Sequence, residues 1–193
     1  VPVIAPPDAA TDDIVTHRRR RFVAFVGWQS EFGLWGQRDP SAAIGVSLGV
    51  SVDLLPWLQV FARTDVIWSP TVDTDLASVS ARSFAGQLGV SALRTWGRLR
   101  LGPELAFGFR RQSTDIEVKD GNAPKASDKV VRPFGRLGGV LLLTLGSHLM
   151  LTANIGLITY MRQYEVRRRS DDILVYATPW LAMDVGCGLR VRF

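Results

Sequence analysis

The sequence has almost none of the side chains that form disulfide frameworks or metal sites. It contains one cysteine, Cys187, and two histidines, His17 and His148. One cysteine excludes an internal disulfide, and two distant histidines leave no Cys/His spacing that is typical of a zinc site. We therefore expect no metal and no cofactor.

Long apolar runs are absent as well, although the chain is apolar on average. Of its 193 residues, 47% are hydrophobic, and the mean hydropathy is +0.11. The longest apolar stretch, residues 137–145, is interrupted by two glycines and a threonine, whereas a membrane-spanning helix needs about 18 apolar residues in a row. A helical membrane protein is excluded, and the length favours a single domain.

Lysine is scarce in a chain that is otherwise basic. The net charge is +5 and the pI is about 10.0, with twenty arginines and only three lysines, all three within residues 119–129. Many arginines lie inside hydrophobic alternating segments. The arginine guanidinium holds its hydrogen-bond donors in a rigid fork, which suits enclosed positions. A genome-wide preference for arginine would give the same count. Because the charge is not gathered into a basic stripe, we expect no nucleic-acid partner.

Residues 1–20 differ in composition from everything after them. They hold three prolines, three aspartates and most of the basic run Arg18–Arg21. Such composition is typical of a linker. We predict a tether over residues 1–20 and one domain over residues 21–193.

From Phe22 to the C-terminus, apolar side chains recur at every second position. Such a period places successive side chains on opposite faces of a β-strand. In the clearest segment, residues 44–54, large aliphatic residues alternate with glycine, serine and aspartate. The pattern predicts eight strands, near residues 22–29, 44–54, 58–68, 84–92, 99–109, 131–145, 149–162 and 173–193.

The predicted connections alternate between short and long. Short turns lie near residues 55–57, 94–97 and 146–148, and long polar connections occupy residues 30–42, 69–82, 111–130 and 164–172. Three short turns at one end and four long connections at the other are the number expected for an eight-stranded up-and-down antiparallel barrel with both termini at the short-turn end.

The chemistry of the second face decides between a soluble barrel and a membrane barrel. A water-exposed face should be rich in lysine and glutamate, but this face is mainly glycine, serine, alanine, threonine and asparagine. The aliphatic face is nearly continuous over the length of a tilted membrane-spanning strand, about 9–11 residues. We predict an all-β fold, an eight-stranded antiparallel up-and-down transmembrane β-barrel. Pro103, inside a predicted strand, requires a bulge or one absent ladder bond.

Charged side chains in phase with the polar face are predicted to converge in the lumen and to pair there, because an unpaired buried charge is costly. This predicted ion-pair network consists of Arg63, Asp65, Glu104, Arg136 and Asp184. An eight-stranded barrel is only wide enough to be filled by its own side chains, which favours a structural role over ion conduction. A second group, predicted as a basic cluster at the short-turn rim that meets lipid phosphates, a partner protein or water, consists of Arg21, Arg98, Arg100, Arg190 and Arg192.

One string has the form of a catalytic motif. Residues 45–49 match G-x-S-x-G around Ser47, with His148 downstream. The nucleophile elbow needs a strand-to-helix turn, whereas here the alternation continues through the motif. We predict no catalytic residues and no enzymatic activity.

The last nine residues carry a resemblance. Apolar residues alternate up to a terminal aromatic, as Leu189, Val191 and Phe193. This stretch resembles the C-terminal assembly signal of small bacterial outer-membrane barrels of the OmpA/OmpX type. The resemblance implies a Gram-negative outer membrane, periplasmic termini and short turns, extracellular long loops, contact with outer-membrane lipid, and insertion by the barrel-assembly machinery.

The functional expectation is therefore a non-enzymatic barrel. We expect a structural anchor or protein-interaction module with a periplasmic or outer-membrane protein as partner, whose tether connects it to an envelope-spanning assembly. The alternatives are a narrow channel or transporter of small apolar ligands, and a soluble ligand-binding barrel.

Overall fold

The computed structural model describes residues 21–35, 42–73, 77–119, 126–163, 165–167 and 174–193, and every regular element in these ranges is a β-strand. The strands are β1 (Arg21–Trp35), β2 (Ala42–Leu55), β3 (Leu58–Asp73), β4 (Ala77–Ala92), β5 (Arg94–Trp96), β6 (Leu99–Val118), β7 (Ala126–Thr144), β8 (Leu149–Tyr160), β9 (Glu165–Arg167), β10 (Leu174–Ala177) and β11 (Leu181–Arg192). No helix in the described ranges is long and apolar enough to cross a membrane. The predicted tether lies outside these ranges.

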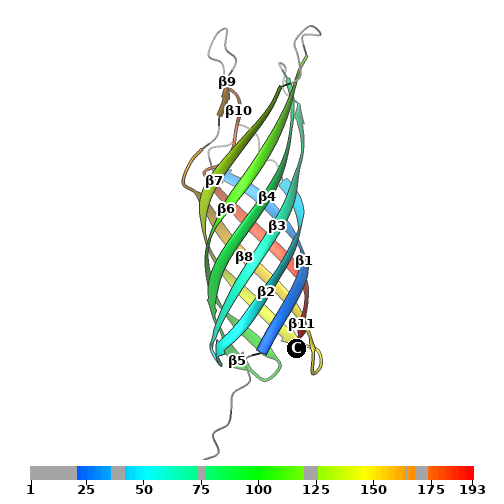
Figure 1. The fold of residues 1–193 in the computed structure, drawn as a ribbon, viewed down its shortest axis with the longest axis vertical. Helices are drawn as coiled ribbons and strands as arrows, with labels where there is room; N and C mark the ends of the chain where they lie inside the picture. The colour runs from blue at the N-terminus through cyan, green and yellow to red at the C-terminus, as the bar shows by residue number, and fades with distance from the viewer. Residues whose placement is uncertain (1–20, 36–41, 74–76, 120–125, 164, 168–173) are drawn as a thin grey trace, which may run out of the picture.

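Eight of the strands close into a barrel. Each of β1, β2, β3, β4, β6, β7, β8 and β11 pairs antiparallel with the next, and β11 pairs back with β1. β5 extends the line of β4 along the start of β6, and β9 and β10 form a small separate hairpin. Figure 1 shows the strands winding obliquely around one axis. The eight-stranded antiparallel up-and-down barrel is confirmed.

The two ends of the barrel differ. The turn end carries β5, the C-terminus and three tight connections, at Pro56–Trp57, Gly97–Arg98 and residues 145–148 (Figure 1). Gly97 has a φ of 58°, a backbone conformation that favours glycine. The opposite, extended end carries β9 and β10.

The predicted long connections at the extended end are largely wrong. β3 runs to Asp73 and β4 starts at Ala77, while β6 runs to Val118 and β7 starts at Ala126, so most of residues 69–82 and 111–130 is paired strand. The cause is that a backbone ladder does not depend on side-chain polarity. Once a strand passes beyond the apolar band, its outward face meets water, and a polar sequence no longer marks a strand end.

The last predicted strand is also divided. Residues 174–177 form β10, which pairs with β9 and not with the barrel, and the barrel strand β11 begins at Leu181. Pro179 lies in the break, and it has no N–H to donate to a ladder.

The aliphatic row of each strand points outward. Val46, Leu48, Leu101 and Leu189 are 45%, 57%, 42% and 43% exposed, while alternate residues such as Asp65 are buried. Exposed aromatics lie near both ends of this band, with Trp57, Trp96 and Phe193 toward the turn end and Trp68, Phe84 and Phe109 toward the extended end. A continuous apolar exterior between two aromatic girdles is the surface of a barrel solvated by hydrocarbon.

Pro103 sits in an interrupted stretch of the ladder. β6 pairs with β4 up to Ser91 opposite Glu104 and with β5 from Arg94 opposite Leu101, in one unchanged register. The pairing is missing between these two points, on the side of the strand where Pro103 offers no N–H. Toward β7 the register continues through Pro103 opposite Gly139. The structure uses an absent ladder bond and not a bulge.

We predict that charge on the outward band is penalised according to depth. Leu48→Arg, in the middle of β2, should cost about 2–4 kcal/mol of unfolding free energy, and Leu54→Arg, at the turn end, about 0–1 kcal/mol. Urea unfolding of the barrel in lipid vesicles measures both. Equal penalties at the two positions would contradict a hydrocarbon environment for this face.

Candidate functional site

The lumen is the most heavily charged part of the described structure. Its inward side chains include the buried arginines Arg63, Arg100, Arg110, Arg132, Arg136 and Arg190. The carboxylates that face them are Glu31, Asp65, Glu104 and Asp184, all buried, and the half-buried Asp53. Each charge must be compensated inside the barrel, because little water can reach it.

Arg136 of β7 is the centre of the middle layer. Its Nε donates to Asp184 Oδ1 at 2.9 Å, and its Nη2 lies 2.9 Å from Asp184 Oδ2. Its Nη1 pairs with Glu104, and its Nη2 also donates to the Asn154 side-chain oxygen at 3.3 Å. One guanidinium thus holds two carboxylates from β6 and β11.

Arg63 of β3 extends this layer across the lumen. Its Nε lies 3.1 Å from Asp65, and its Nη2 lies 3.8 Å from Asp184 Oδ2. Asp65 also accepts hydrogen bonds from Ser47 at 2.6 Å and Gln87 at 2.8 Å. The structure therefore brings all five members of the predicted network into one connected group.

A second charged layer, which sequence reasoning missed, lies toward the extended end. Arg110 of β6 makes a two-pronged pair with Glu31 of β1, at 2.8 and 2.6 Å, and the Tyr160 hydroxyl donates to Glu31 at 2.7 Å. Arg132 lies over the Tyr160 ring at 4.2 Å and donates to Thr178 at 2.6 Å. The sequence did contain a sign of this layer, because Glu31 is two residues after the inward Gln29 and so has the same direction. Glu31 was missed because it lies in a segment predicted to be a loop.

The predicted basic cluster at the turn-end rim is not one surface. Arg100 points inward and pairs with Asp53 at 3.3 Å, and Arg190 points inward and donates to Gln59 at 2.9 Å. Both follow the inward phase of their strands, and the lumen provides partners. Arg98 is exposed in its turn.

The other two members of that predicted cluster are placed as follows. Arg192 is half-buried, with its Nη2 3.5 Å from Met150 Sδ. Arg21 begins β1, and its side chain lies outside the described set. The prediction that the five arginines together face lipid phosphates, a partner or water is therefore wrong for Arg100 and Arg190.

The lumen leaves little free space among the described residues. Two interior cavities have volumes of about 20 and 40 Å³, and a water molecule needs about 10–15 Å³. Toward the turn end, Leu93, Val140 and Leu142 form a buried apolar cluster. Each of these two cavities has room for only a few waters, and the two do not form a continuous path.

The residues of the catalytic-looking string have structural surroundings. Ser47 lies inside β2, is buried, and donates to Gln29 at 3.0 Å and to Asp65. His148 lies in an exposed connection at the turn end, with its Nδ1 3.0 Å from the Arg192 carbonyl oxygen. No strand-to-helix turn surrounds Ser47, and no group of three or more potential metal ligands occurs in the described ranges.

The predicted assembly signal forms the outer face of β11 at the turn end. Leu189, Val191 and Phe193 are 43%, 41% and 76% exposed. The Phe193 N–H donates to the Phe22 carbonyl at 2.9 Å, at the seam where the last strand meets the first. An exposed alternating row at this seam is accessible to a binding partner during closure.

We predict that Arg136 dominates the stability of the lumen. Arg136→Met leaves Glu104 and Asp184 buried without their main partner and should cost about 3–5 kcal/mol. Arg98→Met, at an exposed arginine, should change stability by no more than about 0.5 kcal/mol. The midpoint of urea unfolding in detergent tests both, and equal midpoints would show that the network does not hold the barrel.

The comparisons concern fold. No family model matches the chain, and no curated protein matches its sequence. The attachment invasion locus protein Ail of Yersinia pestis is 11% identical, with 90% of this chain and 99% of that chain covered and a TM-score of 0.58. A major outer membrane protein of Thermus thermophilus is 15% identical, with 88% and 99% covered and a TM-score of 0.58. OprG of Pseudomonas aeruginosa is 10% identical, with 90% and 96% covered and a TM-score of 0.53. The chain thus has the fold of small bacterial outer-membrane β-barrels.

Proposed function

We propose that this protein is a non-conducting, non-enzymatic anchor and interaction module in a Gram-negative outer membrane. The observation that carries the proposal is the pairing of an apolar exterior with a lumen filled by ion-paired arginines. The exterior suits a bilayer. The lumen carries charge, but Arg63, Arg100, Arg110 and Arg136 each form an ion pair with a carboxylate inside the barrel, and Arg190 donates to Gln59.

The interaction surface of this proposal is the extended end. β6 and β7 continue there as a paired ribbon, with exposed charged residues such as Asp115, Lys119 and Asp128. Paired strands present side chains at regular spacing, which favours recognition of another molecule. With the termini periplasmic, as the resemblance implies, this end faces the outside of the cell.

Partners of three kinds follow from this assignment. Outer-membrane lipid contacts the band, and the barrel-assembly machinery recognises the exposed C-terminal row of Leu189, Val191 and Phe193. A periplasmic or outer-membrane protein binds at an end of the barrel. A tether over residues 1–20 would link the turn end to an envelope assembly.

We predict the orientation from single-cysteine labelling of whole cells. In a Cys187→Ser background, Ser127→Cys at the extended end should react with a membrane-impermeant maleimide, and Ser147→Cys at the turn end should react only after lysis. Both serines are exposed, so the bilayer is the only difference between them. Labelling of Ser147→Cys in intact cells would reverse the orientation, and recovery of the protein without detergent would remove the membrane assignment.

We also predict that the purified barrel does not conduct. Planar bilayers with the reconstituted protein should show no steady current steps above those of the detergent alone, because the lumen charges are paired across the barrel. Discrete steps that increase in number with protein concentration would instead support the narrow-channel alternative.

A further inference from the structure

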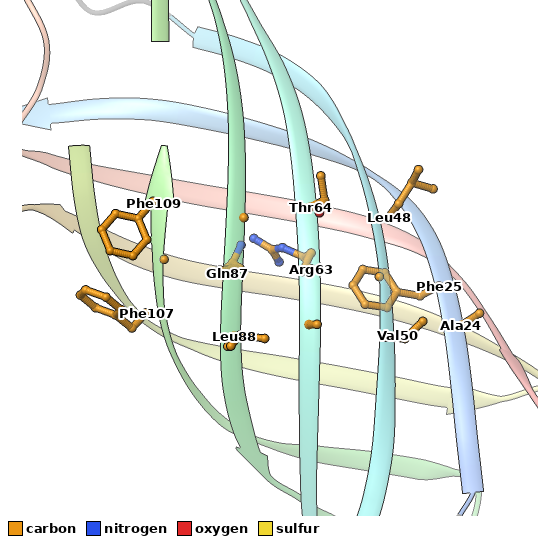
Figure 2. A pocket seen from close by; sticks show the side chains of 14 residues that line it. Ala24, Phe25, Leu48, Val50, Arg63, Thr64, Gln87, Leu88, Phe107 and Phe109 are labelled. Carbon is orange, nitrogen blue, oxygen red and sulfur yellow. The ribbon is translucent and has the colours of Figure 1, made fainter. Parts of the chain in front are cut away.

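The outward face of the barrel has a hollow in the described part of its wall. A hollow of about 940 Å³ opens over β1, β2, β3, β4 and β6. Its floor is made by Ala62, Thr64 and Gly86, and its walls include Leu48, Phe107 and Phe109. Figure 2 shows the two phenylalanines on one side of the hollow and Leu48 on the other, with Thr64 between them.

The register explains why the wall is low there. Leu48, Thr64, Gly86 and Phe109 lie opposite one another on successive strands, so one row of the exterior passes from a tall side chain to a short one, to none, and back to a tall one. A Cβ atom added to Gly86 would meet no heavy atom within 4 Å. The space above this glycine is therefore open, and no neighbouring side chain fills it.

Three cations lie on the outward face between the hollow and the extended end of the barrel. Arg111 follows Phe109 on the outward face of β6, and Arg82 of β4 and Lys129 of β7 both lie opposite Ser113. All three side chains are exposed. None of these three cationic side chains makes a hydrogen bond or an ion pair with another described residue, and the Lys129 backbone N–H donates to Asp128 Oδ1 at 2.7 Å.

The three positive charges lie close to one another on neighbouring strands. Arg82 and Lys129 are diagonal neighbours of Arg111 across the two strand pairs, a separation of about 7–8 Å. After Ser113, the next outward residue of β6 is the acid Asp115, which lies opposite Ser80 and Ser127. Asp115 forms no ion pair with any of the three cations. Like charges at this spacing repel, so the cluster gains free energy when an anion binds between its members.

We propose that the hollow and the cationic cluster together bind one phosphorylated, acylated glycolipid, the lipid A of the outer leaflet. An acyl chain fills the hollow over Gly86, and a phosphate group binds Arg82, Arg111 and Lys129. Basic residues at the border of an apolar band meet lipid phosphates at the depth of the head groups. The proposal rests on the proposed function, because it takes the extended end as the outer leaflet side.

Charge favours this occupant over a second copy of the chain. Two copies in one membrane have the same orientation, so a two-fold interface over the hollow places the same patch on both sides at the same depth. The three cations of one copy would then face the three cations of the other. A phosphate-bearing lipid brings the opposite charge together with the apolar chain.

The test is native mass spectrometry of the full chain released from detergent with added lipids. The probes are bisphosphorylated lipid A, its monophosphorylated form and phosphatidylglycerol. Gly86→Leu, which fills the hollow, should weaken lipid A binding about tenfold, and Arg82→Gln/Arg111→Gln, which removes two charge-assisted contacts, should weaken it about a hundredfold. The monophosphorylated form should bind the wild-type chain more weakly.

Matched controls lie elsewhere on the same barrel. Ala153→Leu places the same leucine side chain on the exposed face of β8, and Arg94→Gln/Arg98→Gln removes two exposed charges at the turn end. Both should bind lipid A like the wild type, and folding of every variant is checked by its migration on an unheated gel.

Three results would overturn the assignment. They are unchanged binding by Gly86→Leu, phosphatidylglycerol binding as tight as lipid A, and a protein dimer that Gly86→Leu abolishes. A reversed orientation appears in the maleimide experiment and not in this one, so failure of the proposed function is distinguishable from failure of the lipid site.

Discussion

Pairing of arginines with carboxylates inside a narrow barrel is the interaction on which the rest of the structure depends. Eight strands enclose a space that side chains fill, so a charge there cannot be hydrated and must find a partner across the lumen. Arg110 of β6 reaches Glu31 of β1, and Arg63 of β3 reaches toward Asp184 of β11. These links join strands that are not neighbours in the sheet, and they therefore fix how far each strand slides along the others. A buried pair of this kind is better at specifying one register than at adding stability.

The same alternation that fills the lumen shapes the exterior. Where a large side chain enters the lumen, its neighbour must be small, as at Gly49, where an added Cβ would overlap the ring of Phe25. The inward glycine therefore belongs to the packing of the interior. Gly86 has the opposite phase, and nothing inside the barrel requires its small size. Small residues on the inward and outward faces of the barrel wall are thus small for different physical reasons. Only the outward ones leave hollows in the surface that contacts the bilayer.

The alternation of apolar and polar residues predicted most of the fold, because it shows which side chains of each strand point inward and which point outward. The outward row of β2 and the inward Arg63, Asp65 and Glu104 follow from that phase without knowledge of any contact. The strand ends did not follow, since beyond the apolar band polarity no longer distinguishes a paired strand from a loop. That error hid Glu31 in a predicted connection and left Arg110 without a partner. The alternation already placed Arg100 and Arg190 on the inward face, but their position near the short-turn end of the barrel suggested a rim.

The scarcity of lysine now has a structural reason as well as a compositional one. Every buried cation among the described residues is an arginine. Arg136 contacts Glu104, Asp184 and Asn154 at once, through three nitrogens held in one plane. A lysine ammonium at the end of a flexible stem would not present donors in that fixed fork, and its charge would be more costly to dehydrate. The described lysines, Lys119 and Lys129, are exposed on the ribbon beyond the apolar band, where water tolerates either cation. Among the described residues, lysine is thus confined to the solvent-exposed surface, whereas arginine occurs both in the lumen and on that surface, as at Arg82, Arg98 and Arg111.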